Sequence, residues 1–434
     1  MISNLNIEVV VKENCPLKNE ALISSVKNEL NGKIVQLADK ITNFDLDVLT
    51  QHVEYIRICE FFKCPSNQTE SDSSKCQEKK EKDSITLVSD LLKIYFLRLN
   101  NEGPQSETIS AENDDTLVAN FTLLPSSYYD GLWEALIFDS NIKDNLLQYA
   151  QAMLRYSKCG VDPTIVSCNR VVLLHGPPGT GKTSLCKALA QKLSIRLSHA
   201  FSHAILIDIN THSLFSKYFS ESGKLVAKMF DKIRELAFES KTLVCVLVDE
   251  VESLTHCRET TRSGSEPSDA LRVVNAVLTN LDNLSHFSNV ITFTTSNITK
   301  AIDRAFVDRA DLRVLIPNPS PYGIYSIYYS CLKELVQKGL IIGPLPEKIR
   351  DKETFENFSG CDYIEGTKLL IELSKDSYGL SGRTLRKVPL RVHATMIHPE
   401  ALPLFVNFLK SMFLAVKVIK EEVDKFTDSH ITLQ

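Results

Sequence analysis

A glycine-rich segment in the middle of the chain has the residue types that hold the phosphates of a nucleoside triphosphate. Its residues are Gly176, Pro177, Pro178, Gly179, Thr180, Gly181, Lys182, Thr183 and Ser184. Glycines let the backbone curl until its N–H groups point at phosphate oxygens, and the helix predicted to follow adds its positive dipole end. We expect Lys182 to reach the β- and γ-phosphates and Thr183 to offer its hydroxyl to Mg²⁺. The segment therefore predicts a nucleotide site.

Two carboxylates follow an apolar run from Leu243 to Val248. Acids at the end of a buried strand are costly unless a charged ligand meets them, so Asp249 and Glu250 are candidates for the same site. We expect Asp249 to hold Mg²⁺ and Glu250 to act as general base on the attacking water. Asn297 ends the next apolar run and is placed to bind that water. The guanine-selecting Asn-Lys-x-Asp pattern is absent, so the set predicts hydrolysis of ATP.

Alternating strands and helices must position these groups. Short apolar runs separated by amphipathic segments predict a parallel sheet covered by helices on both faces. The runs are Arg170–His175, Ala204–Ile209, Leu243–Val248, Val290–Thr295 and Leu312–Ile316. Beyond Pro321 the periodicity is helical only. The predicted fold class is α/β, with a P-loop parallel sheet, a helical lid domain and a small α/β N-terminal domain.

Changes in composition along the chain predict the domain boundaries. The predicted parts are an N-terminal recognition domain at 1–100, a linker at 101–126, a large nucleotide-binding domain at 127–318 and a small helical domain at 319–434. Residues 65–83 are too polar to fold alone and are expected to form a solvated loop within the first domain.

Composition excludes several classes of protein. The 434 residues are 43% hydrophobic, enough for two or three cores, and the net charge of -5 gives no field that would attract nucleic acid. No apolar run is long enough to span a bilayer, and no secretory leader is expected at the amino terminus. The 11 cysteines are scattered and form no Cys-x-x-Cys pair, which is typical of reduced thiols in the cytosol or nucleus.

The chain resembles an AAA+ ATPase of the remodelling, unfoldase-like branch. The resemblance is carried by residues 272–282, by the Ser296-Asn297 pair and by residues 301–309. It implies a hexameric ring of identical subunits with ATP at each seam, where an arginine of one subunit reaches the ATP of the next. Arg309 is the first candidate for that arginine. Its alternatives are Arg304, Arg313 and a purely structural ion pair of this segment with Asp303, Asp308 or Asp311.

The same resemblance assigns roles around the nucleotide. Arg383, within the run from Gly379 to Arg386, matches the second sensor arginine, which reports the state of the nucleotide to the lid. Arg386, one turn further along the predicted helix, is the alternative candidate. A third possibility is that this segment is only a solvated basic helix end with no role at the nucleotide. We expect the approach segment, residues 136–139, to contribute to the adenine pocket.

A further segment resembles the central-pore loop of AAA+ rings that thread proteins. Lys217, Tyr218 and Phe219 are the candidates for gripping an extended client chain, because aromatic rings bind through apolar area that ignores sequence. The alternative is that the two rings belong to the core. Residues 256–269 are placed to form a second pore loop.

Residues 213–224, 266–272 and 379–389 are similar to the AAA+ subgroup that remodels HORMA-domain proteins. This resemblance implies HORMA-domain clients captured by the N-terminal domain with an adaptor, and their conversion from a closed to an open form. It also implies meiotic chromosome and spindle checkpoint control, and residence in the nucleus and cytoplasm with chromosome association in meiosis. The alternative is an AAA+ ATPase that remodels nucleic acid or another protein complex. Neither a membrane nor direct nucleic-acid binding is expected.

Overall fold

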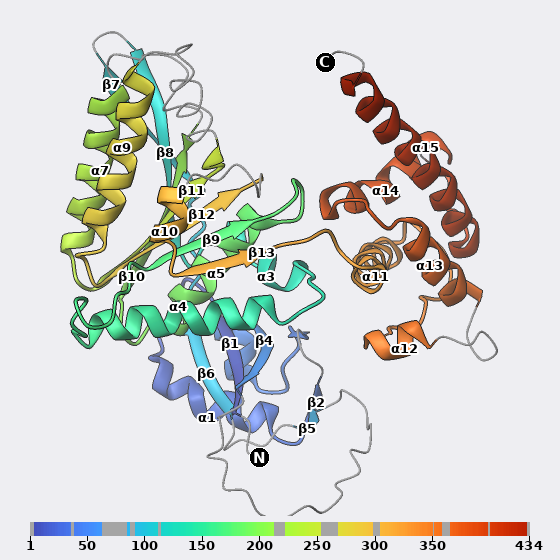
Figure 1. Cartoon of the computed structure of the whole chain (residues 1–434). Helices are drawn as coiled ribbons and strands as arrows, with labels where there is room; N and C mark the ends of the chain where they lie inside the picture. The colour runs from blue at the N-terminus through green and yellow to red at the C-terminus, as the bar shows by residue number, and fades with distance from the viewer. Residues whose placement is uncertain are drawn as a thin grey trace, which may run out of the picture.

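A computed structural model gives the arrangement of the chain in three parts. It describes residues 4–35, 39–62, 85–86, 92–111, 114–211, 222–252, 268–297, 304–349, 351–357, 365–397 and 400–431. Figure 1 shows the N-terminal domain in blue below a large sheet flanked by helices, and a separate helical lid in orange and red to one side. The predicted loop at 65–83 lies outside the described residues.

The N-terminal domain is a small α/β unit. Its elements are β1 (Asn4–Val11), α1 (Asn19–Leu30), β2 (Ile34–Val35), β3 (Lys40–Ile41), α2 (Asp47–His52), β4 (Val53–Phe62), β5 (Ile85–Thr86) and β6 (Leu92–Leu97). The sheet has the order β3-β4-β1-β6, in which β1 is antiparallel to β4 and parallel to β6. Leu22, Val26 and Leu30 are buried at four-residue spacing on α1, so one apolar stripe of this helix packs on the sheet.

The large domain is built on a seven-stranded sheet of order β13-β9-β12-β11-β10-β8-β7. Its strands are β7 (Gln105–Ala111), β8 (Asp114–Leu124), β9 (Val171–His175), β10 (His203–Asn210), β11 (Thr242–Asp249), β12 (Val290–Ser296) and β13 (Leu312–Leu315). The pairs among β9 to β13 are all parallel, which confirms the predicted strands. β11 is buried over nearly its whole length because helices cover both faces of the sheet.

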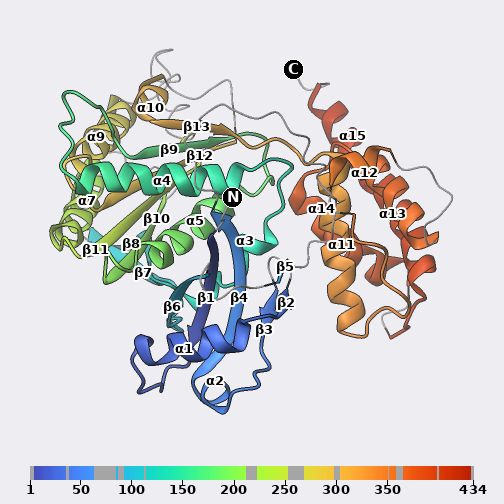
Figure 2. The same ribbon diagram turned by 90° about the horizontal axis from the view of Figure 1, so that it is seen from below.

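Helices α4 and α5 cover one face of this sheet, and α7 and α9 cover the other (Figures 1 and 2). The helices are η2 (Ser127–Tyr129), α3 (Leu132–Ala135), α4 (Ile142–Lys158), α5 (Lys182–Arg196), α7 (Ser222–Phe238), α9 (Ser268–Leu284) and α10 (Arg304–Arg309). On α4, Leu146, Ala150 and Met153 are buried at three- and four-residue spacing. This stripe places α4 against the sheet and α5.

The predicted linker at 101–126 is wrong. Residues 105–124 instead form the hairpin β7–β8, in which β8 pairs antiparallel with β10 and extends the large sheet. A strand near a sheet edge needs apolar side chains on one face only, so it lacks the continuous apolar run that marks the central strands. Thr122 and Leu124 are buried whereas Leu123 between them is 46% exposed, which is this one-sided pattern.

The lid is helical in its described residues, as predicted. It contains α11 (Pro321–Gln337), α12 (Lys352–Glu356), α13 (Glu365–Asp376), α14 (Gly382–Thr395) and α15 (Phe405–Ile431). Ser320 caps α11 by accepting a hydrogen bond from the Gly323 amide, and Pro321 takes the first helical position. α15 is the longest helix, and neither it nor any other helix in the described ranges has the length and apolar character of a membrane span.

Candidate functional site

The phosphate loop leaves the sheet where β9 ends and turns directly into α5. Gly176 has φ of +144°, and a Cβ there would lie 2.2 Å from the Ile316 carbonyl oxygen. Gly179 has φ of +78°, and its Cβ would lie 2.7 Å from Ser381 Oγ of the lid. Glycine is therefore required at both positions by the close approach of other chain segments as well as by the backbone angle.

Lys182 begins α5 and is only 4% exposed. Its ammonium donates hydrogen bonds to the carbonyl oxygens of Gly176, at 2.9 Å, and Pro177, at 2.7 Å. Burial lowers the pKa of Lys182, while the carboxylates that include Glu252 and Asp249 oppose this shift. The charge is thus held beneath the loop, where phosphate oxygens can replace the two carbonyls as acceptors.

Asp249 lies beside the loop as predicted, at the end of β11. Thr183 Oγ1 donates to its two carboxylate oxygens at 2.9 and 3.1 Å, and the Thr295 hydroxyl donates to the same carboxylate. Thr183 and Asp249 present hard oxygen ligands on one side of the loop, which suits Mg²⁺ when phosphate oxygens and waters complete an octahedron. The residues present therefore fit a nucleotide-bound magnesium ion.

Glu250 and Asn297 meet at the same edge of the sheet. Asn297 Nδ2 donates to Glu250 Oε1 over 3.3 Å, and the Glu250 amide donates to Thr295 Oγ1 over 3.1 Å. Glu250 has φ of +56°, a conformation that costs energy for a residue with a side chain and that occurs most at functional sites. The structure brings together the predicted base and the predicted sensor amide.

Glu252 is a site residue that the sequence analysis missed. It is 8% exposed, its Oε1 accepts a hydrogen bond from the backbone amide of Asn297 at 3.0 Å, and its charge opposes the lowering of the Lys182 pKa by burial. It therefore fixes the backbone of Asn297 and adds negative charge near the phosphate loop. The available signal was a third acid close behind Asp249 and Glu250, at a point where the apolar strand has already ended.

The lid contacts the phosphate loop through the start of α14. The amide of Arg383 donates to the Gly179 carbonyl over 3.0 Å, and Ser381 caps the helix by accepting from the Thr384 amide. The Arg383 charge also lowers the pKa of Lys182, which places the guanidinium within electrostatic reach of the loop. Arg386 instead donates to the Ala135 carbonyl. Arg383 is accordingly better placed than Arg386 for the second sensor.

The approach segment lies between the cores of the large domain and the lid. Leu136 and Phe138 pack against the core formed by α4, α5 and the sheet, whereas Ile137 packs against the lid core. Asp139 accepts hydrogen bonds from the Ser320 amide, at 2.8 Å, and from Ser320 Oγ, at 2.7 Å. The segment thus borders the junction where the adenine is expected.

Arg309 forms a two-pronged ion pair across the surface of the large domain. Its Nε and Nη2 lie 2.7 and 2.8 Å from the two carboxylate oxygens of Asp282 on α9. The partners expected from the sequence for a structural ion pair are Asp303, Asp308 and Asp311. Asp311 instead accepts hydrogen bonds from the backbone amides of Asn169 and Val171. The described structure thus gives Arg309 an ion pair within its own chain.

Other predicted residues lie outside the described ranges. Lys217, Tyr218 and Phe219, the pore-loop candidates, fall between 211 and 222, and most of the second predicted pore loop falls between 252 and 268. Asn210, at the end of β10, pairs with Asp249. The first of these ranges therefore follows directly on the edge of the sheet that carries Asp249 and Glu250.

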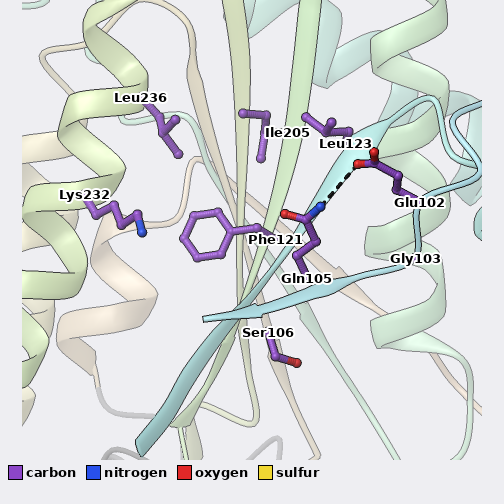
Figure 3. A pocket seen from close by; sticks show the side chains of 9 residues that line it. All are labelled: Glu102, Gly103, Gln105, Ser106, Phe121, Leu123, Ile205, Lys232 and Leu236. Atoms are coloured by element: carbon purple, nitrogen blue, oxygen red, sulfur yellow. Dashed lines mark hydrogen bonds between the residues drawn. The ribbon is translucent and has the colours of Figure 1, made fainter. Parts of the chain in front are cut away.

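A pocket of about 320 Å³ lies away from the nucleotide site (Figure 3). It is lined by residues of β7, β8, β10 and α7 and by the chain just before β7, including Phe121, Ile205 and Lys232. Ile205 is near the start of β10, at the opposite end of the strands from Asp249. This pocket therefore takes no part in the chemistry at the phosphate loop.

The parallel sheet, the phosphate loop and the lid that contacts it define a AAA+ ATPase. Residues 172–318 match the family described as "ATPase family associated with various cellular activities (AAA)". Residues 320–420 match the "TRIP13-like, AAA+ ATPase lid C-terminal domain". Both matches agree with the predicted fold class and enzyme class.

Comparison over the whole chain identifies the branch. The chain is 45% identical over 427 residues to the pachytene checkpoint protein 2 homolog of Gallus gallus, covering 98% of this chain and 95% of that protein. The Homo sapiens homolog is 43% identical over 429 residues, with coverage of 97% and 94%. The chain therefore belongs to the pachytene checkpoint protein 2 family.

One solved structure agrees with this assignment, and a second shares the fold. The structure described as C. elegans PCH-2 has a TM-score of 0.75 and 32% identity, covering 96% of this chain and 99% of that one. An E. coli MS115-1 HORMA:CdnC:Trip13 complex shares the fold, with a TM-score of 0.50, 16% identity and coverage of 68% and 93%.

Proposed function

We propose that this ATPase remodels HORMA-domain proteins, converting them from a closed to an open form with the help of an adaptor. The observation that supports this proposal best is the similarity to pachytene checkpoint protein 2 homologs over nearly the whole chain, N-terminal domain included. The contacts of Thr183 with Asp249 and of Asn297 with Glu250 beside the phosphate loop are consistent with it. The E. coli complex of similar fold contains a HORMA protein and Trip13. The proposed setting is meiotic chromosome and spindle checkpoint control in the nucleus and cytoplasm.

In the proposed mechanism the protein works as a homo-hexamer with Mg²⁺ and ATP. Thr183 and Asp249 would hold the ion, which would supply positive charge beside the phosphates when bound. Lys182 binds the β- and γ-phosphates, and Glu250 accepts the proton of the attacking water while Asn297 orients the glutamate. The lid then moves with Arg383 as the nucleotide changes, and Lys217, Tyr218 and Phe219 pull the client.

The Tyr218→Ala variant tests the proposed client step. It is expected to retain basal ATP hydrolysis but to lose most of the conversion of a closed HORMA protein, because the aromatic grip is missing. Ion-exchange chromatography of the client before and after incubation with adaptor and ATP measures the conversion. Tyr156→Ala, at a tyrosine 50% exposed on α4, is the matched control and should convert normally. Unchanged conversion by Tyr218→Ala would exclude the pore-loop role, and ATPase stimulation by DNA but not by client would favour the nucleic-acid alternative.

The Arg309→Ala variant tests the seam arginine. If Arg309 reaches the ATP of the neighbouring subunit, hydrolysis should fall by about 10³-fold or more while nucleotide binding persists. Asp282→Asn is the control, because it weakens the ion pair but leaves the guanidinium. Steady-state hydrolysis by both variants decides the role: equal losses would mean that only the ion pair matters, and loss in Arg309→Ala alone supports the seam role.

A further inference from the structure

A short segment from Asp130 to Asp139 contacts all three parts of the protein. It includes α3, and it is bounded by residues that bind the N-terminal domain at one end and the lid at the other. Between those ends, Leu136 approaches the phosphate loop: a Cβ on Gly181 would lie 3.2 Å from Leu136 Cδ2. We call residues 130–139 the coupling segment.

At its first end the coupling segment joins a cluster of six charged residues, of which all but Asp130 and Glu134 are buried. The acids are Glu8, Asp130 and Glu134, and the bases are Arg57, Lys192 and Arg196. These six carry three negative and three positive charges, and the more exposed Lys40 adds a positive charge 4.0 Å from Asp130. The N-terminal domain supplies one acid and one base, the coupling segment supplies two acids, and α5 supplies two bases. The cluster therefore joins the N-terminal domain, the coupling segment and the phosphate-loop helix.

Lys192 lies at the centre of this cluster. Its ammonium donates to Glu8 at 2.7 and 2.9 Å and to Glu134 at 2.9 Å, and lies 3.9 Å from Cys59 Sγ. Glu8, Cys59 and Glu134 could together hold a metal ion by their spacing. The lysine ammonium already occupies that position among the same three side chains, so the group is an ion-pair site.

An arginine of the N-terminal domain, Arg57, contacts the coupling segment directly. Arg57 of β4 donates to Asp130 over 2.8 Å and lies 3.7 Å from Glu134 and 3.6 Å from Glu8. Burial raises the pKa of Glu8, but Lys192, Arg196 and Arg57 outweigh this and lower it to about 2. The acid is charged at neutral pH, so moving one partner away would leave a buried charge unpaired, which is costly.

Apolar contacts hold the same interface. Ile195 of α5 packs in a cluster with Val10, Tyr55, Tyr95 and Leu97 of the N-terminal sheet. The Arg196 guanidinium lies 4.5 Å from the centre of the Tyr95 ring. Figure 2 shows β1, β4 and β6 running up to α5 and α3. The N-terminal domain is thus packed directly on the helix that begins with Lys182.

At its other end the coupling segment is tied to the lid. Arg386 of α14 donates to the Ala135 carbonyl, adjacent to Glu134 in the ion cluster. Asp139 accepts two hydrogen bonds from Ser320 at the start of α11. A shift of the lid therefore pulls on backbone and side chains only a few residues from those that bind the N-terminal domain.

We propose that the coupling segment links the position of the N-terminal domain to nucleotide binding, with Arg57 and Glu134 as positioning residues. Nucleotide that orders the phosphate loop and the lid also shifts the residues of the ion cluster, and so changes the affinity of any ligand that displaces the N-terminal domain. Because coupling is reciprocal, that ligand changes the affinity for nucleotide by the same factor. The inference rests on ATP binding alone, and so it stands or fails independently of the client proposed above.

The Arg57→Met variant removes the direct contacts of the N-terminal domain with Asp130 and Glu134, while leaving the second connection, in which Lys192 is paired with Glu8 and Glu134. We expect its dissociation constant for a fluorescent ATP analogue to change by about fivefold or more. Arg98→Met is the control, because the described hydrogen bond of Arg98 goes to the Cys15 carbonyl within the N-terminal domain. Arg57→Lys should restore part of the affinity. Equal affinities for the unaltered protein and Arg57→Met, with both folded, would overturn the proposal.

A second measurement uses the unaltered protein and does not depend on a variant that folds. Cys59 is 7% exposed beside Lys192, and Cys15 is 6% exposed in the core of the same domain. The rate of alkylation at each thiol, read by mass spectrometry with and without ATP, reports opening of the cluster. ATP should change the rate at Cys59 by several-fold and leave Cys15 unchanged. Equal rates at Cys59 in both conditions would contradict the coupling.

Discussion

Replacing Glu250 with glutamine should lower ATP hydrolysis by about 10²–10⁴-fold while ATP still binds. A glutamine oxygen can still accept the hydrogen bond from Asn297 Nδ2, which spans 3.3 Å to Glu250 Oε1, so the local geometry survives and only the proton acceptor is lost. Steady-state hydrolysis and titration with a fluorescent analogue measure the two quantities. Normal turnover by this variant would remove Glu250 from the role of general base.

Glu252→Gln is the matched control for that experiment. Glu252 is also a buried acid at this edge of the sheet, and its described role is to accept the Asn297 amide at 3.0 Å. A glutamine oxygen can replace that acceptor, and Glu250 remains as the base, so the loss of hydrolysis should stay below about tenfold. Similar losses in both variants would mean that the negative charge of the edge matters more than the identity of the base.

Gly176→Ala should abolish nucleotide binding and destabilise the fold by about 1–3 kcal/mol. The added Cβ would lie 2.2 Å from the Ile316 carbonyl oxygen, so either the phosphate loop or the segment after β13 must move. Loop amides aimed at phosphates cannot tolerate that movement. Nucleotide titration and urea unfolding are the measurements.

Gly160→Ala separates this collision from simple backbone strain. Gly160 also has positive φ, at +68°, but a Cβ there would meet nothing within 4 Å. Its variant should lose about 1–2 kcal/mol of stability at most and bind nucleotide normally. If Gly176→Ala kept the affinity of the unaltered protein, the proposed fit between the loop and Ile316 would be wrong.

The strands that hold the site could be predicted because they carry unbroken apolar runs. β11 and β12 are buried on both faces, and the polar residues at their ends, such as Asp249 and Asn297, are exceptions that need a ligand. Parallel strands bring their carboxyl ends to one edge of a sheet. The meeting of Glu250 with Asn297 therefore follows from order along the chain, once the strands are recognised.

The edge hairpin and the ion cluster could not be predicted in the same way. Residues 105–124 pair at the side of the sheet, where polar residues are tolerated and no long apolar run is needed. Glu8 and Lys192 are 184 residues apart, and nothing in the sequence around either residue indicates its partner. Glu8 also lies near Arg57 of its own domain and Lys192 also bonds Glu134, but the packing of the N-terminal domain on α5 is what brings Glu8 and Lys192 together.

At the contact between the lid and the phosphate loop, the backbone and the side chain of Arg383 have separate proposed roles. The main-chain amide of Arg383 binds the Gly179 carbonyl, a bond that any amino acid except proline can make. Attachment of the lid therefore does not depend on the side chain, and in the proposed mechanism the guanidinium serves as the sensor of the γ-phosphate. On that proposal, a substitution at this position would leave a lid that still closes over bound nucleotide but responds in the same way to ATP and ADP.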